Sequence, residues 1–383
     1  MLVERMQPFT STIFAEITQL AVDTGAINLG QGFPDTDGPP SLLADAAANI
    51  TGGVNQYPPG PGVPALRAAV AEHQRRFYGL DVDPAEVLVT VGATEAIASA
   101  VLSLCSTGDE VVAFEPYYDS YPAMVALSGA RFRTVPLRAP DFAFDPDELR
   151  AAFSARTRLV LLNSPHNPTG AVFGREQLTL IAELAAEHDA IVVSDEVYEH
   201  MTFDVAHIPI ATLPGMAERT LTISSAGKTF SVTGWKIGWI SGPPALVAAT
   251  RAVKQFLTYT AGAPLQPAVA SALALPDEFY TGLATSLHGK RDLLAAGLRA
   301  AGFEVFLPRG TYFIVCDGAP LGFDDGYKLA YELPGLCGVA AVPVSVFADS
   351  PEGAAATKSL VRFAFCKRDE VLTEAVDRLA GLR

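Results

Sequence analysis

Between residues 86 and 241 short apolar runs alternate with helical patterns, and this alternation constrains the fold more than any other feature. The runs EVLVTVG, GDEVVAFEP, TRLVLLNS and AIVVSDEVY are rich in valine, leucine, isoleucine and alanine. Strands that are apolar on both faces are typical of a mainly parallel sheet covered by helices on each side. The region therefore predicts an α/β fold.

One strand of this sheet is expected to run the other way. After TLTIS, the strand IGWISG follows a short loop with no helical pattern. A parallel crossover needs a dozen or more residues and usually a helix, so this strand should be antiparallel. From about residue 286 strands and helices mix differently. We predict an N-terminal segment (1–40) packing with a small α+β domain (286–383), and a large domain (41–285) with a mainly parallel seven-stranded sheet.

The composition excludes several classes of partner. The net charge is −15, which argues against binding to nucleic acid or an anionic membrane. The N-terminus lacks a signal-peptide pattern, and no apolar run reaches the roughly 18 residues of a membrane span. Four cysteines lie far apart: Cys105, Cys316, Cys337 and Cys366. This spacing indicates neither a metal site nor a disulfide framework, and it favours the cytoplasm.

The segment SSAGKTFSVTGWKIGW, residues 224–239, contains the first lysine of the chain, Lys228. Small neighbours leave room for a bulky group beside it. Partial burial and a second cation, Lys236, would lower the pKa of this amine and favour Schiff-base chemistry. The alternative is a solvated lysine in a turn.

A second cluster indicates an anion site. Gly92, Ala93 and Thr94 stand where a strand turns into a helix, and exposed N–H groups at a helix N-terminus bind phosphate. The alternative is an ordinary strand–helix junction, which many α/β proteins have. Together with Ser225 and Lys236, however, it predicts a phosphate cup.

Three further residues suggest a site for a charged ligand. Asp195 ends an apolar run, where a buried carboxylate needs a cation. Arg362 is a lone cation within LVRFAF, and its planar donor group suits a carboxylate. Asn167 lies in the turn SPHNPTG after a strand. The alternatives are a surface carboxylate, a structural salt bridge and an ordinary turn.

These motifs, in this order and over nearly the whole chain, resemble the class I aminotransferases, pyridoxal-phosphate (PLP) enzymes of fold type I. The match is closest to the kynurenine and glutamine aminotransferase branch, which has lysine at the position of Lys236. Within it the chain looks most like actinobacterial enzymes assigned as N-succinyldiaminopimelate aminotransferases. The resemblance implies PLP as cofactor and amino transfer to a 2-oxo acid such as 2-oxoglutarate. It also implies a homodimer with composite sites.

The resemblance assigns roles to individual residues. Lys228 would hold the cofactor and move a proton, and Asp195 would keep the ring nitrogen protonated. Tyr198 and Asn167 would bond the phenolic oxygen, and Tyr118 would stack on the ring.

For substrate and partner, the resemblance implies that the Gly32 backbone, Asn167 and Arg362 meet the substrate, whose α-carboxylate Arg362 orients. Tyr57 would reach the phosphate of the neighbouring subunit. The bonds Glu115–Pro116 and Asn167–Pro168 are expected to be cis.

The loop TYTAGAPLQ bears on the substrate. Ala261, Gly262 and Ala263 stand where the branch tends to place bulky ring-bearing residues. Small residues favour a long, flexible substrate such as N-succinyl-diaminopimelate over a planar aromatic one. The loop contains no cation for the distal carboxylate, so one such as Arg5 would come from elsewhere. Transamination of kynurenine, glutamine or methionine, and β-elimination by a C–S lyase, remain alternatives.

Overall fold

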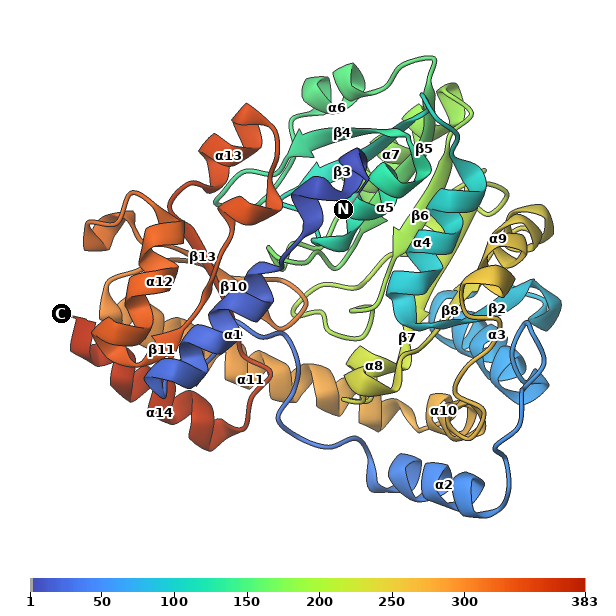
Figure 1. Cartoon of the computed structure of the whole chain (residues 1–383), viewed down its shortest axis with the longest axis horizontal. Coiled ribbons are helices and arrows are strands. Elements are labelled where there is room, and N and C mark those ends of the chain that lie inside the picture. Colours follow the sequence, from blue (N-terminus) through green and yellow to red (C-terminus); the bar gives the residue numbers. More distant parts are fainter. Residues whose placement is uncertain (1–2, 383) are drawn as a thin grey trace.

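A seven-stranded sheet forms the centre of the computed structural model, which describes residues 3–382 (Figure 1). The strand order is β2-β8-β7-β6-β5-β3-β4. The strands are β2 Val87–Val91, β3 Glu110–Glu115, β4 Arg131–Pro136, β5 Thr157–Asn163, β6 Ile191–Asp195, β7 Thr220–Ser225 and β8 Ile237–Ser241. The predicted mainly parallel sheet of seven strands is confirmed.

Only β8 runs against its neighbours in this sheet. It pairs antiparallel with both β2 and β7, whereas the other pairs are parallel. The antiparallel strand predicted from the short loop is therefore confirmed. The expectation that this loop lacks helix was wrong, because residues Ala226–Thr229 form the one-turn helix α8. Four residues are too few to produce a visible helical period.

Both faces of the sheet are buried because alternate strand residues point to opposite sides. Val111 and Ala113 belong to one apolar core, and Val112 and Phe114 belong to another. Helices cover both faces, with α4 against one side of β7 and β8. The helices of this unit are α3 Pro64–Tyr78, α4 Gly92–Leu104, α5 Ser120–Ser128, α6 Pro146–Ala152, α7 Arg175–Glu187, α8, α9 Pro244–Leu257 and α10 Leu265–Leu273.

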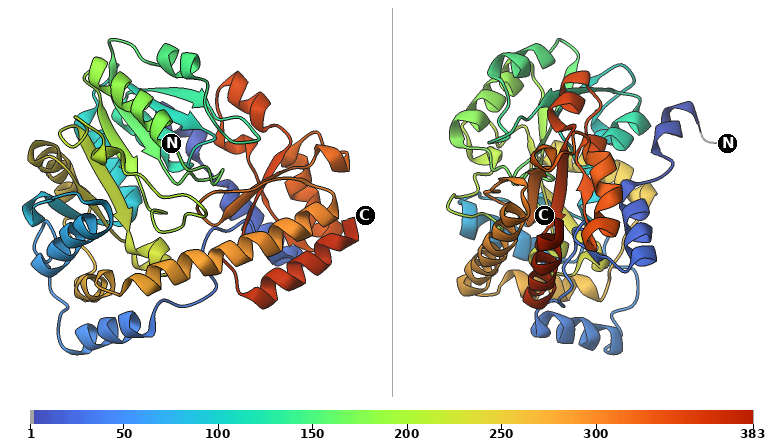
Figure 2. Two further views of the ribbon diagram at one scale, coloured as in Figure 1. Left: turned by 180° about the vertical axis from the view of Figure 1, so that it is seen from behind. Right: turned by 90° about the vertical axis from the view of Figure 1, so that its left-hand side faces the viewer.

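The C-terminal part is smaller and mixes strands with helices. Its antiparallel sheet has the order β12-β13-β10-β9. The strands of this sheet are β9 Glu304–Phe306, β10 Phe313–Asp317, β12 Val342–Pro343 and β13 Leu360–Ala364. A further strand of this part, β11 Val339–Ala340, lies outside that sheet. The helices are α12 Gly326–Cys337, α13 Pro351–Thr357 and α14 Asp369–Leu379. Helix α11, Asp277–Ala301, runs from the side of α10 to this part (Figure 2). The predicted boundary at 285 lies inside α11, so the domain division stays a proposal.

The N-terminal segment contacts the C-terminal part. Helix α1, Ile13–Thr24, packs on α12, and β1, Ile27–Asn28, pairs in parallel with β11. The chain then crosses to α2, Pro40–Thr51, which packs on α10. The ribbon shows this crossing below the sheet (Figure 1).

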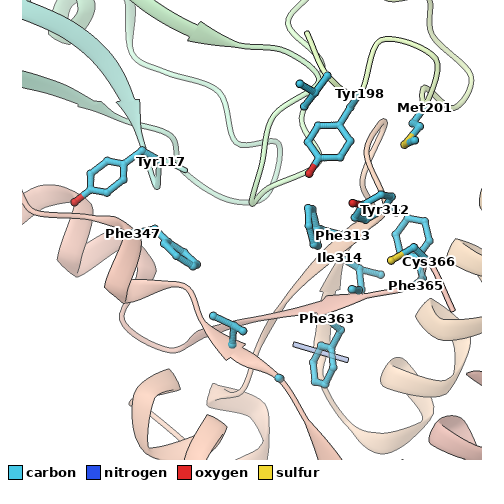
Figure 3. Close-up of a cluster of buried hydrophobic side chains, with 14 of the residues drawn as sticks. Tyr117, Tyr198, Met201, Tyr312, Phe313, Ile314, Phe347, Phe363, Phe365 and Cys366 are labelled. Atoms are coloured by element: carbon cyan, nitrogen blue, oxygen red, sulfur yellow. The ribbon is translucent and has the colours of Figure 1, made fainter. Parts of the chain in front are cut away.

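Aromatic side chains fill the junction between the two parts (Figure 3). Tyr198, from the loop after β6, faces Tyr312 at the start of β10 with ring centroids 5.3 Å apart. The peptide bonds before Pro116 and Pro168 are cis, which confirms both predictions, and those before Pro140 and Pro165 are cis as well. Within residues 3–382 no helix is long and apolar enough to cross a membrane.

Candidate active site

A cavity of about 250 Å³ lies at the carboxyl edge of the large sheet. Twelve of the thirteen predicted site residues line it: Gly32, Gly92, Ala93, Thr94, Tyr118, Asn167, Asp195, Tyr198, Ser225, Lys228, Lys236 and Arg362. Tyr57 does not. The structure thus brings together residues that lie up to 330 positions apart (362 − 32) in the sequence, and their individual roles remain proposals.

The strand ends explain why these side chains meet. Asn163 ends β5, Asp195 ends β6 and Ser225 ends β7. In the parallel register Asn163 lies directly beside Asp195. Because the carboxyl ends of parallel strands share one edge, polar residues placed there converge on one ligand.

Asp195 is buried, with 6% of its surface exposed. The Tyr121 hydroxyl donates a hydrogen bond to its Oδ2 at 2.7 Å, and the Val197 N–H donates to Oδ1 at 3.4 Å. Burial raises the pKa of Asp195 to about 6, although the bond from Tyr121 opposes this rise. A carboxylate in this position is stabilised by a positively charged ligand atom.

Lys228 extends into the cavity from helix α8. Its Nζ donates to the Gly32 carbonyl at 3.5 Å and lies 5.7 Å from the centre of the Tyr198 ring. Burial lowers the pKa of Lys228 to about 8; the charge of Asp195 opposes this shift, and the charges of Arg362 and Lys236 add to it. A lowered pKa increases the fraction of neutral, nucleophilic amine.

This electrostatic setting predicts how Lys228 reacts in the cofactor-free chain. The rate of its acylation by a small amine-reactive reagent such as an activated ester should reach half its maximum near pH 8, not near the ordinary 10.5. Asp195→Asn should move this midpoint lower, because the substitution removes a charge that favours the ammonium form. Peptide mass spectrometry across a pH series measures both values. An unshifted midpoint in the unmodified chain would contradict this description of the site.

Arg362 lies in β13 and is 1% exposed. It donates to Asn167 Oδ1 and to the Gly30 carbonyl, each at 2.9 Å, and lies 4.0 Å from the centre of the Phe313 ring. Its Nε has no hydrogen-bond partner among residues 3–382. Neutral oxygens do not neutralise a buried guanidinium, so this arrangement suits a carboxylate ligand.

Gly32 approaches the ring of Phe313 in β10 so closely that any larger residue would force this ring to move. A Cβ built on Gly32 would lie 2.5 Å from Cζ of Phe313. The Tyr312 hydroxyl donates to the Gly32 carbonyl at 2.7 Å. Figure 3 shows Tyr312 and Phe313 side by side beneath Tyr198. These contacts hold the loop containing Gly32 over the cavity.

The residues of the predicted phosphate cup lie together at the start of α4. Gly92 has φ of +72°, and a Cβ there would lie 3.2 Å from Nζ of Lys236. Thr94 and Ser225 line the same cavity. The glycine allows Lys236 to reach the free N–H groups of the helix, which together favour a phosphate.

The donor set fits PLP, the cofactor that the resemblance implies. Asp195 is a buried acid suited to a protonated pyridine nitrogen, and the cup at Gly92 suits a phosphate. Lys228, an amine with a lowered pKa, lines the same cavity and suits the aldehyde of the cofactor. Each charged part of the cofactor thus has a complementary group in the cavity.

Two residues that contact Asp195 were not predicted. Tyr121, on α5, donates a hydrogen bond to Asp195, and the signal that could have identified it is its spacing of three residues from Tyr118, which precedes α5. The Asn163 side chain donates to the Asp195 carbonyl at 2.9 Å and accepts from the Asn167 N–H at 2.8 Å. Asn163 could have been identified from its position at the end of an apolar strand, which it shares with Asp195.

Three predicted contributors lie outside the cavity of their own chain. Tyr57 is 82% exposed and packs edge-on against Tyr259 at 5.5 Å. The loop 261–263 does not line the cavity, although Gly262 packs on Ile237, which does. Arg5 is exposed in a short 3-10 helix, Glu4–Phe9. The small-residue loop therefore does not widen this cavity within one chain.

Comparison with known proteins agrees with the site. The family model "Aminotransferase class I and II" matches residues 24–379. The "Probable N-succinyldiaminopimelate aminotransferase DapC" of Mycobacterium tuberculosis is 54% identical, covering 100% of this chain and 98% of that protein. A solved structure of N-succinyldiaminopimelate aminotransferase from Mycobacterium tuberculosis matches with a TM-score of 0.97 and 54% identity, covering 100% of each chain.

More distant relatives belong to the same family. The methionine aminotransferase of Escherichia coli is 40% identical, covering 97% of this chain and 96% of that protein. The kynurenine–oxoglutarate transaminase 3 of Rattus norvegicus is 39% identical, covering 97% and 88%. The resemblance predicted from the motifs is confirmed. The chain belongs to the class I and II aminotransferases and is a transaminase that uses pyridoxal phosphate.

Proposed function

We propose that the chain exchanges an amino group between N-succinyl-diaminopimelate and a 2-oxo acid, 2-oxoglutarate in the first instance, in lysine biosynthesis. The observation that carries this choice is the 54% identity over the full length to the mycobacterial relative of that name. The cavity residues support amino transfer in general. They do not by themselves distinguish one amino-acid substrate from another.

In the proposed reaction each residue has one task. Arg362 and the Gly32 backbone orient the α-carboxylate of the substrate. Lys228 takes the proton from the substrate Cα as general base and later returns a proton as general acid. PLP, when bound, supplies the electron sink for this deprotonation. Asp195 holds the ring nitrogen protonated, and Tyr198 with Asn167 bonds the phenolic oxygen.

The distal carboxylate of the succinyl group has no obvious cation in one chain. Among the described residues that line the cavity the cations are Lys228, Lys236 and Arg362. All three have other tasks in this proposal. A contribution from a second copy of the chain would supply the missing contact.

A comparison of kcat/KM for succinyl-diaminopimelate, kynurenine, glutamine and methionine tests the substrate. We expect a preference of at least about tenfold for succinyl-diaminopimelate, which corresponds to about 1.4 kcal/mol in transition-state binding. A preference of that size for kynurenine or methionine would overturn the assignment. Release of pyruvate or ammonia from a cysteine S-conjugate at a higher rate would favour the C–S lyase alternative.

We further propose that the active unit is a homodimer with composite sites. Tyr57 is exposed and away from its own cavity, and the nearby aromatic residues Phe256 and Tyr259 are 86% and 51% exposed. Large exposed aromatic side chains are typical of protein interfaces. In this proposal Tyr57 bonds the cofactor phosphate in the partner subunit.

Mixing two inactive variants tests the composite site. After subunit exchange between Tyr57→Phe and Lys228→Ala dimers, each mixed dimer contains one site with both changes and one with neither. The mixed dimers should therefore show about half the activity of the unmodified dimer, because one of two equivalent sites is intact. If exchange is demonstrated by mass and activity does not return, each subunit builds its own site.

A cytoplasmic location is also proposed. All four cysteines are free thiols in the structure, as expected in a reducing compartment. Cell fractionation followed by immunodetection tests this, and recovery in an extracytoplasmic fraction would refute it.

A further inference from the structure

Two histidines and a glutamate form a buried group outside the active-site cavity. His73 comes from α3, and Glu199 and His200 come from the loop that follows β6. One donor atom of each residue lies within 4.8 Å of the other two. His73 is 2% exposed and Glu199 is 4% exposed. The reaction proposed above uses none of the three.

The carboxylate of Glu199 is incompletely satisfied. Its Oε1 accepts a hydrogen bond from the Ser224 hydroxyl at 2.6 Å. Its Oε2 is buried and makes no hydrogen bond of normal geometry among the described residues, although the Tyr78 hydroxyl is close enough to help lower the pKa of Glu199. A buried carboxylate is costly unless a cation lies beside it.

The surrounding side chains do not supply that cation. A pair of neutral rings that shares one proton accounts for the 2.7 Å contact between Nε2 of His73 and Nε2 of His200. Burial, the charge of Glu199 and a hydrogen bond to Glu199 raise the pKa of the neighbouring Tyr78 hydroxyl, which therefore stays neutral. Arg75 and Arg76, the basic residues nearest to His73 in sequence, pair with Glu72 and Asp277.

The two imidazoles present ligand atoms to each other. Nε2 of His73 and Nε2 of His200 lie 2.7 Å apart, so they can share a single proton. Nδ1 of His73 is buried without a partner. Neutral imidazole nitrogens are the commonest metal ligands in proteins, and zinc binds both imidazole nitrogens and carboxylate oxygens.

We propose that His73, Glu199 and His200 bind one divalent transition-metal ion of the zinc type. The ion supplies the positive charge that Glu199 lacks and replaces the proton between the two rings. Tetrahedral zinc with bonds of about 2.0–2.1 Å would set the two nitrogens about 3.3 Å apart, so the rings must separate by roughly 0.6 Å. Three protein ligands leave one position for water.

The site would connect two elements that are distant in sequence. Helix α3 provides His73, and Glu199 directly follows Tyr198, which lines the active-site cavity. Ser224, the hydrogen-bond donor to Glu199, directly precedes Ser225 of the phosphate cup. The ring of Tyr280 covers His200 at 4.4 Å between centroids and limits access of water. The ion therefore has a structural role behind the active site.

Zinc binding by the PLP-loaded chain tests this proposal. After treatment with a chelator and removal of the chelator, the protein is titrated with Zn²⁺ in competition with a chromophoric chelator. We expect one equivalent per chain and a rise in Tm on binding. His200→Gln should weaken the affinity by about tenfold or more. His188→Gln is the matched control, because His188 lies at the end of α7 beside the Ser154 carbonyl and should bind as the unmodified chain does.

Zinc-edge X-ray absorption of the unmodified chain gives a second test that requires no variant to fold. The expected spectrum contains two imidazole shells and oxygen ligands. Sulfur ligation, less than stoichiometric binding, or equal affinity in His200→Gln and the unmodified chain would each overturn the proposal.

Discussion

Replacing Lys228 with arginine should lower kcat by about 10³-fold or more, because it removes the group that we propose moves the substrate proton. Arginine keeps the positive charge but does not deprotonate in proteins. It therefore can neither act as base nor bond covalently to the cofactor. Steady-state kinetics with a saturating amino donor and 2-oxoglutarate measures the loss.

Lys236→Arg is the matched control for this substitution. Both lysines line the same cavity, and the second change keeps a cation at the phosphate cup. It should retain most of the activity, because arginine keeps a positive charge and hydrogen-bond donors for the phosphate. If Lys228→Arg kept near-normal turnover while Lys236→Arg lost it, the proton would be moved by Lys236 and not by Lys228.

Asp195→Asn should lower kcat by about 10²–10³-fold while leaving cofactor bound. The neutral amide fills the same space beside Tyr121 but no longer favours a protonated ring nitrogen. Absorbance of the bound cofactor separates binding from turnover in this variant. Normal turnover would show that ring protonation does not depend on Asp195.

The same carboxylate predicts a pH effect on cofactor loading. Burial raises the pKa of Asp195 to about 6 in the cofactor-free chain. As the pH falls through about 6 the carboxylate gains a proton and loses the charge that attracts a pyridinium. Loading should therefore weaken below this pH in the unmodified chain, and this dependence should be absent in Asp195→Asn.

Prediction from the sequence was most successful for polar site residues that lie at or just after the end of a strand. Asp195, Asn167 and Ser225 follow apolar runs that read as strands, so their convergence follows from a parallel sheet. The lysine at 228 was found from its small neighbours although its one-turn helix was not expected. Local patterns were sufficient for these residues because backbone direction alone places them.

Residues whose role depends on packing between distant segments could not be found this way. Tyr312 bonds the Gly32 carbonyl across 280 positions, and nothing in TYFIVCD indicates that partner. The domain boundary was predicted at residue 285, where the strand pattern changes. The helical periodicity of α11 continues through this residue, so the helix crosses the predicted boundary. The exposed position of Tyr57 could not be predicted either, because exposure depends on which distant segments of the chain pack nearby.

Reduction of the PLP-loaded protein with borohydride, followed by peptide mapping, tests the central claim most directly. The claim is that Lys228 is the residue to which the cofactor is attached. The cofactor mass should appear on one peptide, with fragment ions placing it on Lys228. Attachment to Lys236 or any other lysine, or no attachment in a protein that binds PLP, would contradict the account.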